Sequence, residues 1–342
     1  MVKSKSHIDK PKVYFHSRYD GDTLQSTHLQ NAHDALVEVF DLCGSSEADF
    51  SISLDYSAGN LRLLQNQNIT PRRRFLLVRE PKQVHPYPHS KKAKSDFGSI
   101  YYLGTVDDNT AVAQLWPYSR EFDATAADFA TSTPVARDSK VVAIASWRVS
   151  FIRGSLYSLR ARAFSKLAID TYGRDWNAPI GKKIKEVIAQ VLMAAGNEFG
   201  LAQDLAPQII SKPSNYKGSL ASKFETLQRY KATLIIENST DYMSEKVLDA
   251  FASATIPIYC GTSLSSFGIP DDLYVSCAPN LDSVREAVAR ALDVDYESWR
   301  GHLLSWLESE KGIELFHEKL QWERLFADVR DEMIQGQVNE VQ

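Results

Sequence analysis

The sequence predicts an α/β protein made of two domains. Short apolar runs rich in β-branched residues recur along the chain, and the segments between them have helical periodicity, which is typical of strands that alternate with helices. At 342 residues the chain is too long for one ordinary core. Residues 119–139 are rich in Ala, Thr, Ser and Asp and show little periodicity, so we expect domains at 1–138 and 139–312, followed by a C-terminal helix within 313–342.

The first domain is expected to hold a parallel sheet. We expect its strands at residues 12–16, 50–54, 75–78 and 98–103, with a helix at 32–43. The run at 75–78 reads FLLV and is apolar throughout, as in a central strand that is covered on both faces.

The second domain repeats the alternation of strands and helices. We expect strands at 141–146, 169–172, 233–236, 256–260 and 273–275. We expect helices at 154–167, 180–199, 219–229, 281–292, 296–307 and 313–333, and one more that begins near Met243.

Composition excludes several classes of protein. The net charge of −4 argues against a nucleic-acid-binding protein, which needs a basic surface. No apolar run is long enough to span a bilayer, and the charged N-terminus lacks the apolar stretch of a signal peptide. The three cysteines (Cys43, Cys260 and Cys277) show neither metal-ligand nor disulfide spacing, so we expect no metal site and a reducing, cytoplasmic location.

The segment 230–261 is the most informative part of the chain. It predicts a strand, a polar loop, a helix and a second strand that ends at Gly261, which together form a βαβ unit. In such units ligands bind at the carboxyl ends of the strands, and a helix N-terminus attracts anions. The side chains expected at that point are Glu237, Asn238, Tyr242, Glu245 and Lys246. Carboxylates next to an ammonium group suit a ligand that carries both hydroxyls and phosphates.

This segment resembles the α-1,3/4-fucosyltransferases, glycosyltransferase family 10. The resemblance rests on Tyr230-Lys231, Glu237-Asn238-Ser239, Tyr242-Met243-Ser244-Glu245-Lys246 and Ile256-Pro257-Ile258-Tyr259-Cys260-Gly261. It extends over residues 140–275 and is loose in the N-terminal half. It implies the GT-B architecture, in which two Rossmann-like domains face each other across a cleft and the final helix crosses back to the N-terminal domain.

The resemblance implies an inverting transferase that moves L-fucose from GDP-β-L-fucose to a glycan hydroxyl in α-1,3 or α-1,4 linkage, as in surface-glycan or lipopolysaccharide synthesis. Two alternatives remain open: a transferase that uses another GDP-sugar, and a non-catalytic GDP-sugar-binding relative. No cofactor is required, although an added divalent cation would help GDP to leave. The partners are the donor and a glycan acceptor, with peripheral contact to the inner face of the membrane as an option.

The resemblance also assigns roles to residues. Lys246 and Arg160 would bind the diphosphate, and Glu245 would face the fucose. Asn238 and Tyr242 would form hydrogen bonds to the donor, and Glu237 would either contact the ribose or cap the loop. These assignments compete with ordinary surface, packing and loop roles.

The general base is expected from the N-terminal domain. Glu80 follows the apolar strand at 75–78, where the family carries its catalytic glutamate. An exposed loop glutamate is the competing interpretation. Basic clusters at Arg72-Arg73-Arg74 and at Lys91, Lys92 and Lys94 could bind anionic lipid or simply be solvated.

Overall fold

The computed structural model describes residues 10–18, 30–105, 125–133, 136–195 and 212–341. The chain forms two compact units. Unit 1 comprises Met1–Glu80, Tyr87–Leu103 and His317–Gln342, and unit 2 comprises Pro81–Pro86 and Gly104–Phe316.

Unit 1 is built on a five-stranded sheet in which every pairing is parallel, with the order β2-β1-β3-β4-β5. Its strands are β1 (Lys12–Ser17), β2 (Asp41–Leu42), β3 (Phe50–Leu54), β4 (Arg74–Val78) and β5 (Ser99–Tyr102). This is a doubly wound order, with a switch in direction between β1 and β3. The apolar run at 75–78 lies in β4, which is buried along its length and pairs with β3 and β5, so its predicted central position is confirmed.

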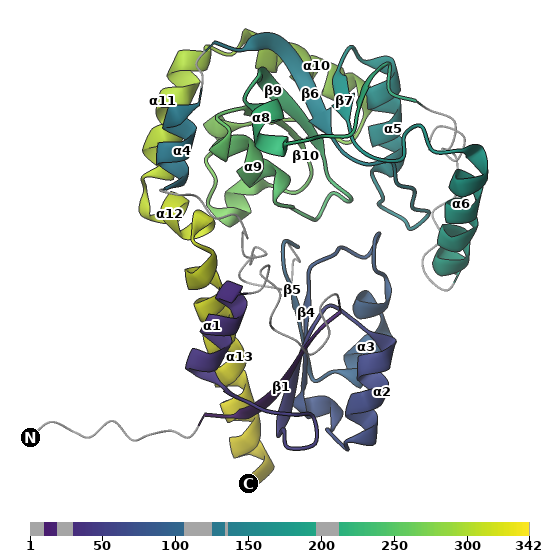
Figure 1. The fold of residues 1–342 in the computed structure, drawn as a ribbon, viewed down its shortest axis with the longest axis vertical. Coiled ribbons are helices and arrows are strands. Elements are labelled where there is room, and N and C mark those ends of the chain that lie inside the picture. Colours follow the sequence, from purple (N-terminus) through teal and green to yellow (C-terminus); the bar gives the residue numbers. More distant parts are fainter. Residues whose placement is uncertain (1–9, 19–29, 106–124, 134–135, 196–211, 342) are drawn as a thin grey trace, which may run out of the picture. The chain divides into compact units, whose positions relative to one another are not determined.

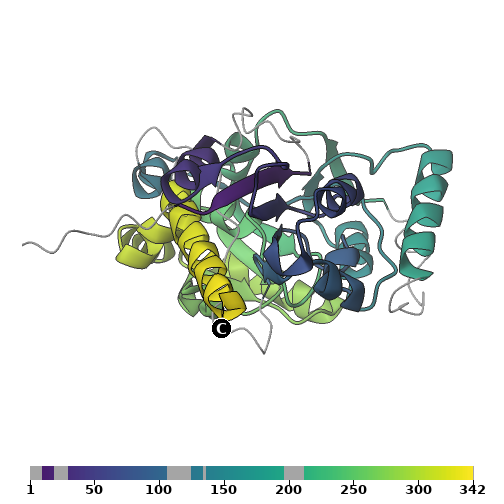
Figure 2. The ribbon, with the colours of Figure 1, turned by 90° about the horizontal axis from the view of Figure 1, so that it is seen from below.

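Helices cover both faces of this sheet (Figure 1). They are α1 (Gln30–Val39), α2 (Ala58–Asn66), α3 (Lys91–Asp96) and α13 (Glu318–Val341). The chain's last helix, α13, packs beside α1 (Figures 1 and 2). Its Trp322 ring is fully buried and stacks on Phe326, with ring centroids 5.2 Å apart, and Phe40 meets Phe326 edge-on. Residues from the far end of the chain therefore complete the core of unit 1.

The final helix is interrupted, contrary to the single helix expected at 313–333. The structure has α12 (Glu310–Phe316) in unit 2 and α13 in unit 1. His317 lies between them, and its Nδ1 accepts a hydrogen bond from the backbone N–H of Leu320 at 3.1 Å. This bond satisfies one of the unpaired N–H groups at the start of α13, so the chain can begin a new helix here.

Unit 2 is built on a six-stranded parallel sheet with the order β11-β10-β9-β6-β7-β8. The strands are β6 (Asp138–Ile144), β7 (Asp170–Tyr172), β8 (Asn215–Gly218), β9 (Tyr230–Ile236), β10 (Ile256–Cys260) and β11 (Val275–Ser276). From β8 to β11 the strands follow the 3-2-1-4-5-6 order of the Rossmann fold. The direction of winding reverses between β6 and β9, the first and fourth strands of the unit. Strand β8 was not expected from the sequence.

The helices of unit 2 pack around this sheet (Figure 1). They are α4 (Ala126–Ser132), α5 (Tyr157–Lys166), α6 (Ile180–Ala195), α8 (Lys223–Leu227), α9 (Lys246–Ala252), α10 (Leu281–Asp293), α11 (Tyr296–Leu307) and α12. The stretch assigned to the domain boundary from composition contains α4, which packs against α9 and α11. Thr125 and Asp128 form a capping box at its start. By its contacts, the chain from Gly104 to Phe316 belongs to unit 2, together with Pro81–Pro86.

No helix within the described ranges is both long and apolar enough to cross a membrane.

Replacing Trp322 with alanine should unfold unit 1 selectively, because α13 fills the core of that unit from the end of the chain. Loss of a buried Trp side chain costs about 3–5 kcal/mol. Hydrogen exchange should become faster in β1 and β3 and stay unchanged in β9 and β10. Asp328→Ala, on an exposed position of the same helix, is the control and should change stability by less than about 0.5 kcal/mol. Equal rates of amide hydrogen exchange in β1 and β3 of the wild type and of Trp322→Ala would show that Trp322 of α13 does not stabilise unit 1.

Candidate functional site

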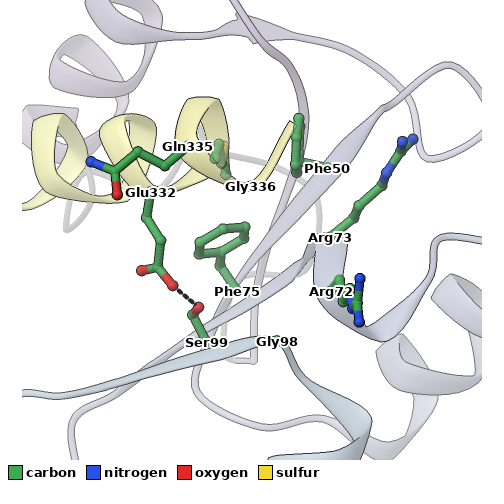
Figure 3. A pocket seen from close by; sticks show the side chains of 10 residues that line it. Phe50, Arg72, Arg73, Phe75, Gly98, Ser99, Glu332, Gln335 and Gly336 are labelled. Atoms are coloured by element: carbon green, nitrogen blue, oxygen red, sulfur yellow. Dashed lines mark hydrogen bonds between the residues drawn. The ribbon is translucent and has the colours of Figure 1, made fainter. Parts of the chain in front are cut away.

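Each unit contains a cavity. The cavity of unit 1 has a volume of about 350 Å³ and lies where β3, β4 and β5 begin, under the C-terminal half of α13 (Figure 3). Phe75 lies between Glu332 on one side and Arg73 on the other, and Glu332 accepts hydrogen bonds from Ser99 and Tyr101. Of the arginine cluster, Arg74 is buried and donates to the carbonyls of Ile69 and Asp96, so its role is structural.

The cavity of unit 2 has a volume of about 440 Å³ and lies at the other end of its strands. Its walls include Ile144 to Ser146 after β6, Gly173 and Arg174 after β7, and the inner part of β9. Lys223 of α8 and Glu245, Lys246 and Asp249 at α9 complete the lining. Ligands of doubly wound sheets bind at the carboxyl ends of the strands, beside the switch point. The cavity of unit 2, and not that of unit 1, meets this condition.

Glu237 organises the loop beside this cavity. It follows β9 directly, and its side chain is fully buried. Its carboxylate accepts hydrogen bonds from the backbone N–H of Ser244 at 2.9 Å and from the Ser244 hydroxyl at 2.8 Å. The Lys246 ammonium lies 3.4 Å from the same carboxylate. A buried carboxylate is stable only when it is paired and hydrogen-bonded, and Ser244 and Lys246 meet both needs. These contacts agree with loop capping, one of the two roles that the sequence left open for Glu237.

Lys246 is the first residue of α9 and lines the cavity. Its Nζ donates to the Ser244 hydroxyl at 2.8 Å. Burial lowers the pKa of Lys246, but the carboxylates of Glu237 and Glu245 raise it by more, so the pKa lies above its ordinary value. The ammonium therefore stays charged at neutral pH and remains a cation at the cavity wall.

Arg160 belongs to α5 and binds the start of the loop that follows β9. Its side chain is buried, its Nε donates to the carbonyl of Ile236 at 3.1 Å, and its guanidinium donates to the Asn238 side-chain oxygen at 3.1 Å. The guanidinium also lies 4.7 Å from the centre of the Tyr157 ring. Arg160 and Asn238 therefore act together at the end of β9, although neither lines the cavity.

Tyr242 is buried in the loop before α9. Its backbone carbonyl accepts a hydrogen bond from the Tyr259 hydroxyl at 3.1 Å, and its backbone forms an isolated antiparallel bridge with Thr105. Gly104 makes this approach possible, because a Cβ there would lie 2.5 Å from the carbonyl oxygen of Met243. Tyr242 also does not line the cavity, and these contacts place it in the packing of the loop.

Lys223 is a cavity residue to which the sequence analysis gave no role. Its Nζ lies 2.5 Å from the buried carboxylate of Asp249 and 3.7 Å from that of Glu245, whose side chain is half exposed. The pair joins α8 to α9. The run 223–227 comes shortly before the strand of segment 230–261, and this position could have drawn attention to Lys223. Its partner Asp249 is 26 residues away, and the sequence gave no reason to pair the two residues.

Glu80 lies in unit 1, just beyond β4, and is half-buried. Its backbone carbonyl accepts a hydrogen bond from Nε2 of His89 at 3.1 Å. The neighbouring Arg79 side chain is engaged elsewhere, since its Nε donates to the buried Asp55 carboxylate at 2.7 Å. The structure thus brings Arg160, Glu237, Asn238, Tyr242, Glu245 and Lys246 together in unit 2, and places Glu80 in unit 1.

Metal ligation has no candidate site within the described ranges, where no three His, Cys, Asp or Glu side chains gather around a common point.

Replacing Gly261 with alanine should disturb the site directly. The added Cβ would lie 2.4 Å from the Tyr259 hydroxyl and 2.9 Å from Cγ of Glu237, so both side chains must move. Such overpacking costs about 1–3 kcal/mol, which urea denaturation will measure. The matched control is Gly301→Ala in α11, where a Cβ meets no atom within 4 Å. That change should be neutral or stabilising by up to about 1 kcal/mol. Unaltered stability of Gly261→Ala would contradict the tight contact at Glu237.

Comparison with known proteins gives structural matches. No protein-family model and no curated protein sequence matches the chain. An α1,3-fucosyltransferase crystal structure superposes with a TM-score of 0.54 and 15% identity, covering 97% of this chain and 93% of that one. Its complex with GDP-fucose gives a TM-score of 0.53 at 14% identity with the same coverage. The α,α-trehalose 6-phosphate synthase of Burkholderia multivorans gives 0.48 at 12% identity, covering 91% and 75%.

The two parallel α/β units and the match along almost the whole chain agree with the fold expected from the sequence. The protein therefore has the GT-B glycosyltransferase fold, which it shares with the α1,3-fucosyltransferase structures.

Proposed function

We propose that the protein is a glycosyltransferase of family 10 that moves L-fucose from GDP-β-L-fucose to a hydroxyl of a glycan acceptor. The observation that carries this proposal is the arrangement of Glu237, Ser244 and Lys246 beside the cavity of unit 2. The sequence that forms this arrangement is the segment that resembles the fucosyltransferases. The matching structures include one that contains GDP-fucose, and the fold agrees with the proposal.

The diphosphate of the donor needs positive charge within the cavity. Lys246 and Lys223 both present ammonium groups there, and Lys246 keeps its charge because of the neighbouring carboxylates. Hydrogen bonds between ammonium groups and phosphate oxygens are charge-assisted and hence strong. Two lysines can offset the charge of the departing GDP, so the proposal requires no resident metal. A divalent cation would act in GDP release.

The carboxylate of Glu245 is placed to contact the fucose of the donor. It is half exposed on the cavity wall, and Lys223 lies 3.7 Å from its carboxylate. A carboxylate in this position can accept hydrogen bonds from fucose hydroxyls and stabilise positive charge that develops on the sugar ring during transfer. Arg160 and Asn238 would serve the donor by fixing the loop at the end of β9.

The base in this proposal is Glu80 of unit 1. It would take the proton of the acceptor hydroxyl while the hydroxyl oxygen attacks C1 of fucose from the face opposite the diphosphate. The bond from C1 to the diphosphate oxygen breaks, GDP leaves with the electron pair, and the β linkage becomes an α linkage. The neighbouring Arg79 binds Asp55.

Two alternatives remain: a transferase that uses another GDP-sugar, and a non-catalytic protein that binds a GDP-sugar. The same cations would hold the same diphosphate in each case. A sugar with a methyl group and one with a hydroxymethyl group differ by one hydroxyl, and a hydrophobic pocket rejects such an analogue only modestly. We place all these activities in the cytoplasm, on the basis of the cysteine content.

Nucleotide binding will test the proposed donor site. GDP-fucose and GDP should raise the melting temperature of the wild type, and UDP-galactose should not. In calorimetric titrations Lys246→Met should weaken GDP binding about 10- to 150-fold, since a charged hydrogen bond contributes about 1.5–3 kcal/mol. Lys166→Met, on an exposed position of α5, is the control and should bind GDP as the wild type does. A response to UDP-galactose alone would overturn the assignment.

The role of Glu80 will be tested by transfer assays. Glu80→Gln should lower the rate of transfer by about 10²- to 10⁴-fold, the usual contribution of a general base. GDP-fucose binding should persist in this variant, because the donor residues lie in unit 2. Glu47→Gln, on an exposed position of unit 1, should keep full activity. Intact transfer by Glu80→Gln would mean that another group is the base. A wild type that binds GDP-fucose but modifies no glycan in a broad panel would favour the non-catalytic alternative.

A further inference from the structure

Helix α6 (Ile180–Ala195) carries a row of exposed aliphatic side chains. Ile180, Ile184, Ile188 and Leu192 are 61%, 47%, 54% and 70% exposed. Residues four apart lie on one face of a helix, so the four side chains form a continuous apolar stripe. Elsewhere in the described ranges, the large hydrophobic side chains with comparable exposure are Val37 and Ile313, which stand alone. A contiguous apolar stripe of this kind marks an interaction surface.

The residues that precede the stripe by one position, on a neighbouring face of α6, fix this orientation. Val187 and Val191 pack against the core of unit 2. Lys183 is buried, its Nζ donates to the carbonyl of Trp176 at 3.0 Å, and the same atom lies 5.1 Å from the centre of the Trp147 ring. In both ribbon views the helix stands at the margin of its unit (Figures 1 and 2). The exposed stripe is therefore directed away from the core by contacts that a substitution within the stripe would leave intact.

Positive charge borders the stripe. Lys182 and Lys185 are exposed and follow the apolar residues around the helix on its solvent side. Lys182 contacts Asp175 at 2.5 Å, and Arg148 lies 4.0 Å from the same carboxylate, so this single acid is shared by two cations. Within α6, three lysines stand against one acid, Glu186. An apolar stripe with a basic border is the pattern of helices that lie in the surface of an anionic membrane.

We propose that α6 docks the protein onto the surface of an anionic lipid bilayer. The helix would lie in the plane of the membrane, with Ile180, Ile184, Ile188 and Leu192 inserted at the boundary of headgroups and acyl chains. Lys182 and Lys185 would contact the lipid phosphates. This proposal stands independently of the donor site, since none of these residues lines that cavity.

A bilayer fits the stripe better than a second copy of the chain does. The stripe runs from Ile180 to Leu192, which is about 18 Å along one helix. A specific protein interface buries about 1,200–2,000 Å² in total, which one row of four side chains from each copy cannot supply. A membrane has no such minimum, because lipids adapt to the inserted side chains and the lysines add attraction to the anionic surface.

Vesicle flotation of the full chain will test this docking. The wild type should float with vesicles that contain phosphatidylcholine and phosphatidylglycerol, and much less with phosphatidylcholine alone. The double variant Ile184→Ser, Ile188→Ser should lose at least about tenfold in partitioning, because it removes half of the inserted stripe. Ile313→Ser is the matched control, since Ile313 is 50% exposed outside the stripe, and should float as the wild type does. Circular dichroism will verify that each variant is folded.

A second variant tests the charges without touching the stripe. Lys182→Gln with Lys185→Gln should reduce flotation on anionic vesicles and leave the weak binding to neutral vesicles unchanged; added salt should act in the same way. The proposal fails if the wild type does not float with anionic vesicles, or if the serine double variant floats undiminished. It also fails if sedimentation shows a dimer that the serine double variant dissociates while flotation stays the same, because a second copy would then be the occupant.

Discussion

The buried Glu237 carboxylate is the interaction on which the site in unit 2 depends. It lies at the end of β9 with no exposure to solvent, and charge in such a place requires compensation. Ser244 and Lys246 provide it from the other end of the loop, and this draws the start of α9 against the end of the strand. Gly261, with no side chain, leaves room for the carboxylate, and Arg160 binds the strand's last carbonyl. In this arrangement of the short loop, the buried charges of Glu237 and Arg160 both have hydrogen-bond partners.

Sequence patterns predicted the parts of the structure that are determined locally. The apolar run at 75–78, the βαβ unit of segment 230–261 and the gathering of polar residues at its turn follow from periodicity over short windows. Features that depend on distant contacts were missed. The pair between Lys223 and Asp249 forms only when α8 and α9 come together. The break at His317 depends on a side-chain cap, and α4 shows no clear period because alanine and polar residues make up most of it. These three features could be identified only from contacts in the folded structure.

Several residues on which the resemblance to the fucosyltransferases rests form contacts within the protein that suggest a positioning role. Asn238 and Tyr242 were expected to form hydrogen bonds to the donor, and Glu237 to contact the ribose or cap the loop; in the structure they are bound to Arg160, Tyr259 and Ser244, respectively. Residues that hold a loop in position can matter to a reaction as much as residues that touch the substrate, since catalysis needs groups fixed within fractions of an ångström. Lys223, Glu245 and Lys246 line the cavity from α8 and from the start of α9, beside the loop that these residues hold in position.

The charged groups around the cavity of unit 2 are paired with one another, and this pairing bears on the proposed binding of a diphosphate. Three cations (Arg160, Lys223 and Lys246) stand against three carboxylates (Glu237, Glu245 and Asp249), and Arg174 on the cavity wall adds a further positive charge. Glu237 has additional hydrogen bonds from Ser244 and does not depend on Lys246 alone. An ammonium group has three donors, and those of Lys246 reach Glu237 and Ser244 within the described part of the chain. Under the proposed function, the remaining N–H of Lys246 would meet a phosphate oxygen while the buried Glu237 carboxylate keeps its hydrogen bonds from Ser244.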